Sequence, residues 1–301
     1  MSQRRWQTWL VLAVGVVAVS TSGPLIAAVA APALAVAFWR NALATSVLVP
    51  VTAASPRTRR QLRALDRRTL GACVAAGVVL AIHFGTWVPS VTMTNVATST
   101  ALVCTGPVWT ALIAARLGRP VGSQAWAGIG LAVTGAALAT GADFAVSREA
   151  VLGDLLALAG GVAAAVYVTL GERVRATVST TAYTTVCYAV CAATLLLVCL
   201  IAGVRLAGYD GRTWVLLAAL TIGPQFLGHS SVNWAVGRLS ATVVSVVTLL
   251  EVPGAALLAL LFLHQRPPAL ALPGLVVLLL GVAVVLLGVK YRTRPAAEMT
   301  P

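Results

Sequence analysis

The chain has 301 residues, of which 59% are apolar and only 10% charged, with a mean hydropathy of +0.93 and a formal net charge of +13. This composition excludes an ordinary soluble globular domain, in which about a quarter of the residues are charged. The apolar runs are continuous and do not alternate with polar residues, so they predict membrane-spanning helices rather than the strands of a barrel.

Helical spans of about 20 residues each are expected, and the predicted fold class is an all-α integral membrane protein with ten transmembrane helices. The second span contains Arg40, a charged residue that is costly to place in a membrane. Residues 54–69 carry six arginines and are expected to form a loop. In chain order the predicted spans are residues 7–28, 33–53, 70–89, 95–115, 124–141, 152–170, 180–201, 214–235, 241–262 and 270–289.

The two halves of the sequence resemble each other at an offset of 146 residues, at which His83 coincides with His229. Each half holds five predicted helices, an odd number, so the second half must cross the membrane in the opposite sense, as in transporters built from inverted repeats. We therefore predict a first five-helix repeat at residues 1–141 and a second at 142–301, with a short cytoplasmic tail. The other matches at this offset are Gly77 with Gly223, Ser99 with Ser245, Pro107 with Pro253, Gly128 with Gly274 and Gly135 with Gly281.

Basic residues concentrate on one side of the predicted membrane. With a cytoplasmic N-terminus, sixteen of the 21 Lys and Arg residues lie inside, four lie outside, and Arg40 lies within the membrane. This bias predicts a multi-pass protein of the cytoplasmic (inner) membrane with both termini in the cytoplasm, and the positive charge needs no nucleic-acid partner. Arg4, Arg5 and the apolar stretch that follows also resemble a secretory signal peptide, whose cleavage would leave nine spans.

Glycine and proline interrupt two of the spans, at Ser22-Gly23-Pro24 and at Gly223-Pro224. Because proline has no N–H to donate, local breaks in the helical hydrogen bonding are expected there, acting either as gates or as static bends. All five cysteines fall inside predicted spans. They read as small apolar core residues rather than as a disulfide framework or zinc ligands.

Polar residues inside the spans mark the candidate site, because such residues are costly in lipid. In the eighth span Gln225, His229 and Asn233 recur every four residues and share one helix face. His83 and Trp87 hold related positions in the third span, and the two stripes predict a pocket for a small amphipathic solute. The alternative is that these side chains only join helices by hydrogen bonds. Two histidines without supporting carboxylates or thiolates predict no metal site, and no cofactor motif is found.

Glu251 is the only carboxylate deep within a predicted span. It is a candidate for proton coupling, with a structural ion pair to Arg40 or snorkelling at a helix end as the alternatives. Arg40 itself either binds an anionic group of the substrate or braces the second helix. Tyr167 and Thr98 are further candidates for substrate contact, although hydroxyls such as that of Thr98 often bond to their own helical turn.

Several motifs resemble those of the ten-helix EamA-type transporters, which belong to the drug/metabolite transporter superfamily, and the resemblance covers nearly the whole chain. It implies export of a small metabolite, an amino-acid-like compound or a drug. The matching elements are Phe38-Trp39-Arg40, Ala101–Pro107, the helix that holds Gly128 and Gly135, and Leu249-Leu250-Glu251-Val252-Pro253. Two helix ends depart from the family's Leu-Gly-Glu pattern, namely Leu117-Gly118-Arg119 and Leu263-His264-Gln265.

The sequence as a whole predicts a secondary-active transporter that works by alternating access between two inverted repeats, in contact with the bilayer and a small-molecule substrate. No phosphate-binding loop, zinc-protease motif or nucleophile elbow is present, so an enzyme is not expected. A non-transporting membrane scaffold or sensor is the main alternative, and a membrane-embedded enzyme is a lesser one. The substrate, the direction, the coupling ion and the choice between a monomer and a homodimer stay open.

Overall fold

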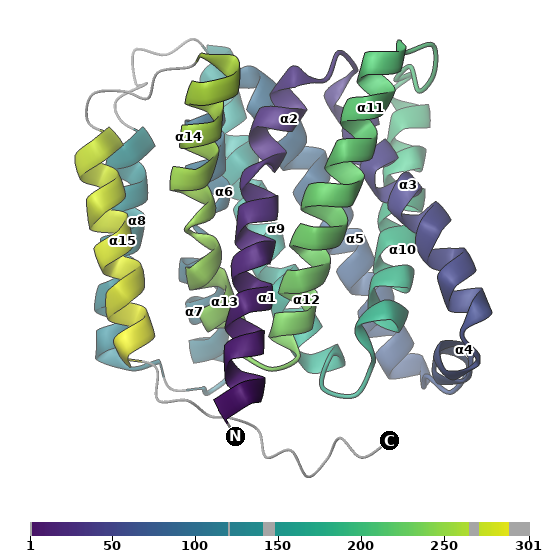
Figure 1. The fold of residues 1–301 in the computed structure, drawn as a ribbon, viewed down its shortest axis with the longest axis horizontal. Coiled ribbons are helices and arrows are strands. Elements are labelled where there is room, and N and C mark those ends of the chain that lie inside the picture. The colour runs from purple at the N-terminus through teal and green to yellow at the C-terminus, as the bar shows by residue number, and fades with distance from the viewer. Residues whose placement is uncertain (1, 120, 141–147, 265–270, 289–301) are drawn as a thin grey trace.

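The computed structural model describes residues 2–119, 121–140, 148–264 and 271–288, which are helical apart from their connections. The helices stand side by side in one bundle and run between its upper and lower ends (Figure 1). They are α1 (Ser2–Ser20), α2 (Ser22–Ala28), α3 (Ala33–Ala54), α4 (Pro56–Arg63), α5 (Arg67–Met93), α6 (Val96–Val103), α7 (Gly106–Arg116), α8 (Ser123–Thr140), α9 (Arg148–Val174), α10 (Thr180–Ile201), α11 (Gly211–Leu220), the π-helix η1 (Thr221–His229), α12 (Ser230–Val236), α13 (Ala241–Thr248), α14 (Glu251–Leu263) and α15 (Ala271–Gly288).

Within the described residues, eight stretches are long and apolar enough to cross a membrane, so the chain is a multi-pass membrane protein. Large apolar side chains such as Val17 and Ile201 are exposed on the outside of the bundle, where lipid would meet them. Helices α8 and α15 occupy the predicted spans 124–141 and 270–289 but are not among the eight, and the count of ten stays a prediction. The eight stretches are Trp6–Ala28, Ala33–Ala54, Arg67–Met93, Val96–Arg116, Arg148–Val174, Thr180–Ile201, Gly211–Val236 and Ala241–Leu263.

The second half of the chain runs in the opposite direction to the first. Helix α5 follows α4 at the lower end of the bundle, whereas its counterpart starts with α11 at the upper end and finishes with α12 lower down (Figure 1). The same inversion relates α6 and α7, which descend, to α13 and α14, which ascend. This inversion of the second half agrees with the inverted repeats expected from the sequence.

The arginine-rich segment 54–69 differs from the predicted loop, because it contains the helix α4. Ser55 caps this helix by accepting a hydrogen bond from the backbone N–H of Thr58 (3.3 Å), and Pro56 supplies a φ angle that suits a first helical residue. Asp66 then caps α5 by accepting from the N–H of Thr69 (2.6 Å), which holds the pKa of this carboxyl below its usual range. The third span is consequently longer than predicted at its start.

Two breaks occur where glycine and proline predicted them. Helix α1 gives way to α2 at Thr21, directly before Ser22-Gly23-Pro24. The segment around Pro224 is a π-helix, in which each N–H bonds to the carbonyl five residues earlier. Proline cannot donate a helical hydrogen bond, so both disruptions have the expected cause.

Two further breaks were not predicted, and they stand at related places in the two halves. Cys104 and Thr105 separate α6 from α7, and Leu249 and Leu250 separate α13 from α14. A proline follows each break within a few residues, at Pro107 and Pro253, so one ladder hydrogen bond is missing at the same level of both helices. The fourth and ninth predicted spans are therefore discontinuous helices.

Helices α8 and α15 pack against each other along their length at one side of the bundle (Figure 1). A Cβ atom on Gly135 would collide with the backbone of Leu278 and lie 2.7 Å from the carbonyl oxygen of Gly274. A Cβ atom on Gly281 would meet the backbone of Ala132 and the carbonyl of Gly128 in the same way. These two sets of residues are related by the offset of 146, so the crossing is a symmetric contact between the repeats.

The core lies between the two halves. Its largest cluster includes Phe84 of α5 together with Tyr183 and Tyr188 of α10, all fully buried. A smaller cluster packs α1 against α12 and α13, through residues such as Leu12 and Val244. Both clusters join helices from different repeats, and they surround the cavity described next.

Candidate functional site

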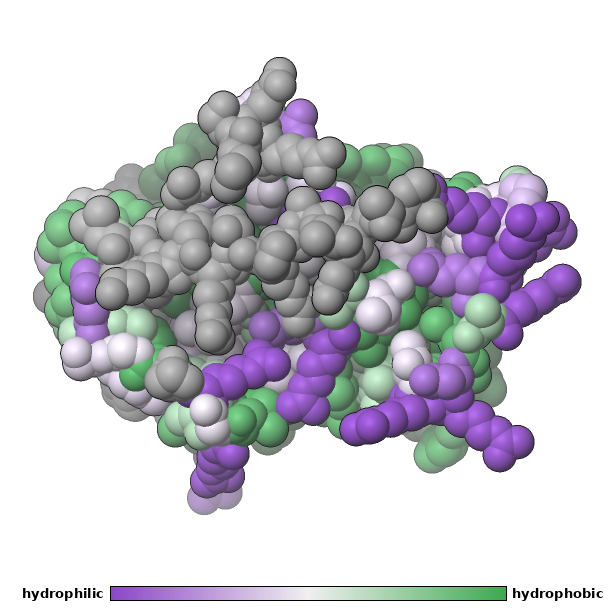
Figure 2. Space-filling model, turned by 90° about the horizontal axis from the view of Figure 1, so that it is seen from below, coloured by the Kyte–Doolittle hydropathy of each residue, from purple (hydrophilic) through white to green (hydrophobic). Residues whose placement is uncertain are grey.

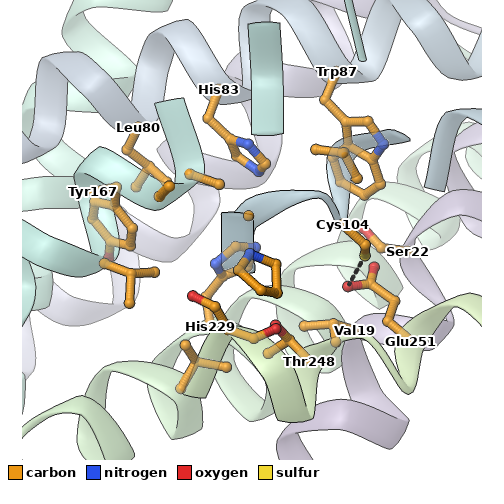
Figure 3. A pocket seen from close by; sticks show the side chains of 18 residues that line it. Val19, Ser22, Leu80, His83, Trp87, Cys104, Tyr167, His229, Thr248 and Glu251 are labelled. Carbon is orange, nitrogen blue, oxygen red and sulfur yellow. Dashed lines mark hydrogen bonds between the residues drawn. The ribbon is translucent and has the colours of Figure 1, made fainter. Parts of the chain in front are cut away.

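A cavity of about 90 Å³ lies between the two halves of the bundle (Figure 3). Sites for drug-sized ligands usually enclose about 300–1,000 Å³, so in this conformation the cavity accepts a small solute or must widen. Each half contributes nine of its lining residues, which are Val19, Ser22, Leu80, His83, Trp87, Val103, Cys104, Gly106, Pro107, Ala164, Ala165, Tyr167, Val168, His229, Val232, Ser245, Thr248 and Glu251.

The helix breaks place much of this lining. Ser22 opens α2, Cys104 stands between α6 and α7, and Glu251 is the first residue of α14. Discontinuous helices of this kind expose half-helix ends to the interior of a membrane protein, where backbone groups and the helix dipole can act on a solute. Because Glu251 occupies the first turn of α14, the positive end of that helix favours a negative charge on its carboxylate.

The two histidines related by the repeat meet in the cavity. The rings of His83 and His229 are 6.1 Å apart between centroids and point toward one another (Figure 3). His83 also stacks on Trp87 at 5.6 Å, and its Nδ1 is hydrogen-bonded to the carbonyl oxygen of Gly160 at 3.0 Å. Equivalent residues of two inverted repeats thus face each other, and they place the pseudo-symmetry axis close to the cavity.

Two polar groups in the lining are poorly satisfied by the protein. The Nε1–H of Trp87 is buried and has no hydrogen-bond partner. The carboxylate of Glu251 accepts only a long contact from the thiol of Cys104, 3.9 Å between Sγ and Oε2. A buried donor or acceptor without a partner is costly, so the cavity offers one free N–H and one under-used carboxylate to whatever enters it.

Arg40 lies behind the cavity lining, fully buried. Its Nε donates to Oε1 of Gln225 at 3.1 Å, its Nη1 donates to the hydroxyl of Ser22 at 3.2 Å, and its guanidinium lies 4.2 Å above the Phe84 ring. Nη2 has no hydrogen-bond partner. Arg40 and Glu251 form no salt bridge. Within the described part of the chain, the ion pair that forms joins Arg119 to Glu172. The guanidinium of Arg40 therefore links α3 to α2 and η1 by hydrogen bonds.

A second polar cluster closes the lower part of the site. The side-chain amide of Asn233 is hydrogen-bonded to the hydroxyl of Tyr167, 2.7 Å between Nδ2 and Oη. Arg175 donates from Nε to the carbonyl oxygen of Asn233 at 3.2 Å and from Nη2 to the hydroxyl of Thr180 at 2.6 Å. It also donates to the carbonyl of Val178. These contacts join α9, α10 and α12 below the cavity.

The structure brings together five of the predicted site residues and leaves four outside the lining. His83, Trp87, Tyr167, His229 and Glu251 line the cavity. The other four are buried elsewhere, and they are Arg40, Thr98, Gln225 and Asn233.

The polar stripe of the eighth span is divided between the cavity and its surroundings. Gln225 and His229 both lie in η1, but of the two it is His229 that lines the cavity. The amide of Gln225 lies between Arg40 and Asn41, with 3.0 Å between its Nε2 and Oδ1 of Asn41. The sequence alone gave no reason to place a π-turn at that position beyond the presence of Pro224.

Sequence reasoning missed several residues of the site. Cys104 was assigned to the apolar core, yet it contacts Glu251. Ser22, named only as part of a helix break, and Thr248, which was not named, line the cavity. Their common signal is proximity to a helix break. Arg175 is also buried and hydrogen-bonded, although the sequence analysis did not propose it for the site.

The inverted halves, the broken helices and the shared cavity define a polytopic membrane protein of the transporter class. The chain belongs to the EamA-like transporter family, whose model matches residues 5–141 and again residues 151–287. The two matches start 146 residues apart, which is the offset found within the sequence, and they confirm the two-repeat architecture. The family is one of transporters rather than of enzymes.

A solved structure described as "Crystal structure of protein" has the same fold, with a TM-score of 0.72 and 21% identity over 93% of this chain and 96% of that chain. At this identity the likeness concerns the fold alone. A search of curated proteins finds no match for this chain.

Proposed function

We propose that this protein is a secondary-active exporter of a small metabolite, an amino-acid-like compound or a drug. It works by alternating access between two inverted repeats that together make ten spans, α8 and α15 included. It resides in the cytoplasmic membrane with both termini in the cytoplasm, as the distribution of basic residues favours.

The observation that carries this proposal is the cavity lined equally by both repeats, with His83 and His229 facing each other across it. When two inverted halves enclose a site, rocking one half against the other opens the site to alternate sides. A scaffold has no need for a central cavity whose wall holds a free indole N–H and a carboxylate, since both are costly in an apolar interior.

The chemistry of the lining favours a solute that carries a protonated amine and a hydrogen-bond acceptor. Glu251 supplies a carboxylate at the start of α14, and Trp87 supplies an N–H donor. The imidazoles of His83 and His229 and the ring of Trp87 give the solute an aromatic surface over which a cation is attracted. An amino-acid-like compound presents both polar groups within a small volume.

Glu251 also suits a role in proton coupling. Its carboxylate has only the long contact with the Cys104 thiol, so it can bind either a proton or a substrate amine, but not both at once. Competition between a proton and a substrate amine for one carboxylate couples their movements in opposite directions. Arg40 holds α2, α3 and η1 together and keeps a positive charge within reach of this carboxylate without pairing with it.

The experiment is flux into proteoliposomes driven by a pH gradient, with a panel of amino acids and cationic drugs. We expect gradient-dependent flux for the wild-type protein and its loss, by at least about a hundredfold, in Glu251→Gln. Glu172→Gln is the matched control, because Glu172 forms a surface ion pair with Arg119 and lies outside the cavity.

Flux that persists in Glu251→Gln would remove Glu251 from the pathway while keeping the transporter. Absence of flux for every solute, with protein that is folded and inserted, would contradict the transport function itself. Trp87→Phe is a second test: it keeps the aromatic surface but removes the N–H, so we expect weaker binding of solutes with an acceptor and unchanged thermal stability.

A further inference from the structure

The helix α4 separates its charged residues from its packing residues. Four arginines of α4 are exposed, namely Arg57, Arg59, Arg60 and Arg63. Because an α-helix turns by about 100° per residue, all four lie on one half of the helix. Leu62 lies on the other half and packs against the main core cluster. The helix therefore lies on the bundle with a basic outer face.

The exposed face of α4 has no acidic partner. Within the described residues no Asp or Glu forms a salt bridge with these arginines, since the ion pair present is Arg119 with Glu172. Like charges also stand three or four residues apart, at Arg57 with Arg60 and at Arg59 with Arg63, which destabilises a helix. An anion bound over this face would relieve the repulsion.

Figure 2 views the lower end of the bundle and shows hydrophilic side chains gathered at its right-hand edge, where Figure 1 places α4. The helices on either side of α4 in the chain present apolar side chains outward. Val47 and Val51 are exposed near the end of α3, and Leu70 and Val74 are exposed near the start of α5. Each pair is four residues apart, so each forms an apolar strip on one helix face.

We propose that the outer face of α4 is a binding site for the headgroups of anionic phospholipids. The phosphate lies against the arginines, and the acyl chains run along the apolar strips of α3 and α5. Arginine pairs with phosphate through two parallel N–H bonds. The apolar strips favour a lipid over a free anion, because they contact its acyl chains. The proposal rests on the membrane placement of the bundle, not on transport.

The position of α4 gives such a lipid a structural consequence. Helix α4 belongs to the first repeat but contacts α10 of the second. Gln61 fixes this contact by donating from Nε2 to the carbonyl of Thr177 (3.3 Å) and accepting from the N–H of Ser179 (3.1 Å). A lipid held on α4 therefore steadies a joint between the two repeats.

The test compares phosphatidylglycerol with phosphatidylcholine on the purified full chain, by native mass spectrometry of retained lipid and by thermal unfolding. The variant is the triple Arg59→Gln, Arg60→Gln, Arg63→Gln. The matched control removes three exposed arginines of the opposite end, as Arg148→Gln, Arg205→Gln, Arg212→Gln. We expect wild-type and control protein to retain equal amounts of phosphatidylglycerol. The α4 variant should retain less of it, by a factor of about ten or more.

Phosphatidylglycerol should also raise the midpoint of thermal unfolding of the wild-type and control proteins but not of the α4 variant, because it binds the folded state. Equal loss in variant and control, or no loss in the variant, would overturn the proposal. Displacement of the lipid by inorganic phosphate at equal concentration would assign the site to a free anion and would overturn it too. Should the glutamine variant fail to fold, the triple replacement by lysine keeps the charge but not the paired N–H bonds, and reduced retention is expected.

Discussion

Gln225 and Arg40 together show how buried polar side chains join three helices of the bundle. Its carbonyl accepts from Arg40 Nε and its amide donates to Asn41 Oδ1, while the Arg40 guanidinium continues to Ser22. All four side chains are buried, so water cannot take the place of a partner that is removed. The network holds an intramembrane cation in place without a carboxylate, through neutral oxygens and the face of Phe84.

Gln225→Leu should therefore destabilise the protein by about 2–4 kcal/mol, because it leaves a charged donor and an amide oxygen without partners. Chemical unfolding in detergent micelles measures this. Gln124→Leu is the control, since Gln124 is exposed on α8 and makes one long bond, 3.4 Å from its Nε2 to the carbonyl of Val284. That substitution should fall within about 0.5 kcal/mol of wild type. Equal stability of both variants would show that the network is dispensable.

At the scale of whole elements, glycine lets α8 and α15 cross with their backbones in close contact. Gly135 and Gly281 each meet the partner backbone, and without a side chain the two helices approach directly. The seven-residue spacing of Gly128 and Gly135, repeated at Gly274 and Gly281, places each pair on one face of its helix.

Gly135→Ala and Gly281→Ala should each destabilise the protein by about 1–3 kcal/mol, because the new methyl group forces the helices apart. The matched control is Gly130→Ala on the same helix, where a Cβ would meet nothing within 4 Å. Alanine is the better helix former, so this control should be neutral or stabilising by up to about 1 kcal/mol. Thermal unfolding in detergent separates the cases, and a harmless Gly135→Ala would contradict the close crossing.

At the scale of the whole molecule, the inverted repeats make the two ends of the bundle chemically different. The lower end carries α4 and the N-terminus, and the upper end carries the connection between α10 and α11, with Arg205 and Arg212 (Figure 1). The proposed cytoplasmic placement of the lower end agrees with its greater number of basic residues under the positive-inside rule.

Single cysteines test this orientation, because the five native cysteines are all buried and should not label. In intact cells a membrane-impermeant maleimide should label Arg212→Cys but not Arg60→Cys. Permeabilised cells should give labelling of both. The reverse pattern would invert the proposed topology, and with it the direction in which the exporter faces.

The class of protein, the approximate positions of the helices and the pairing of the two halves could be predicted from the amino-acid sequence alone. These predictions follow from properties that run along the chain: the length of apolar runs, the offset of 146 residues and the odd number of spans expected in each half. The pairing even predicts that His83 and His229 hold equivalent places, although not that they meet.

The sequence pattern could not predict which polar side chains reach the cavity. The direction of a side chain depends on how far its helix is rotated and where the helix is interrupted, and packing against other helices sets both. Gln225 bonds to Arg40 while His229 lines the cavity, and Glu251, directly after a helix break, lies beside Cys104 and not in a salt bridge with Arg40. Regular 3.6-residue spacing predicts which residues share a helix face, but not which face turns toward the cavity.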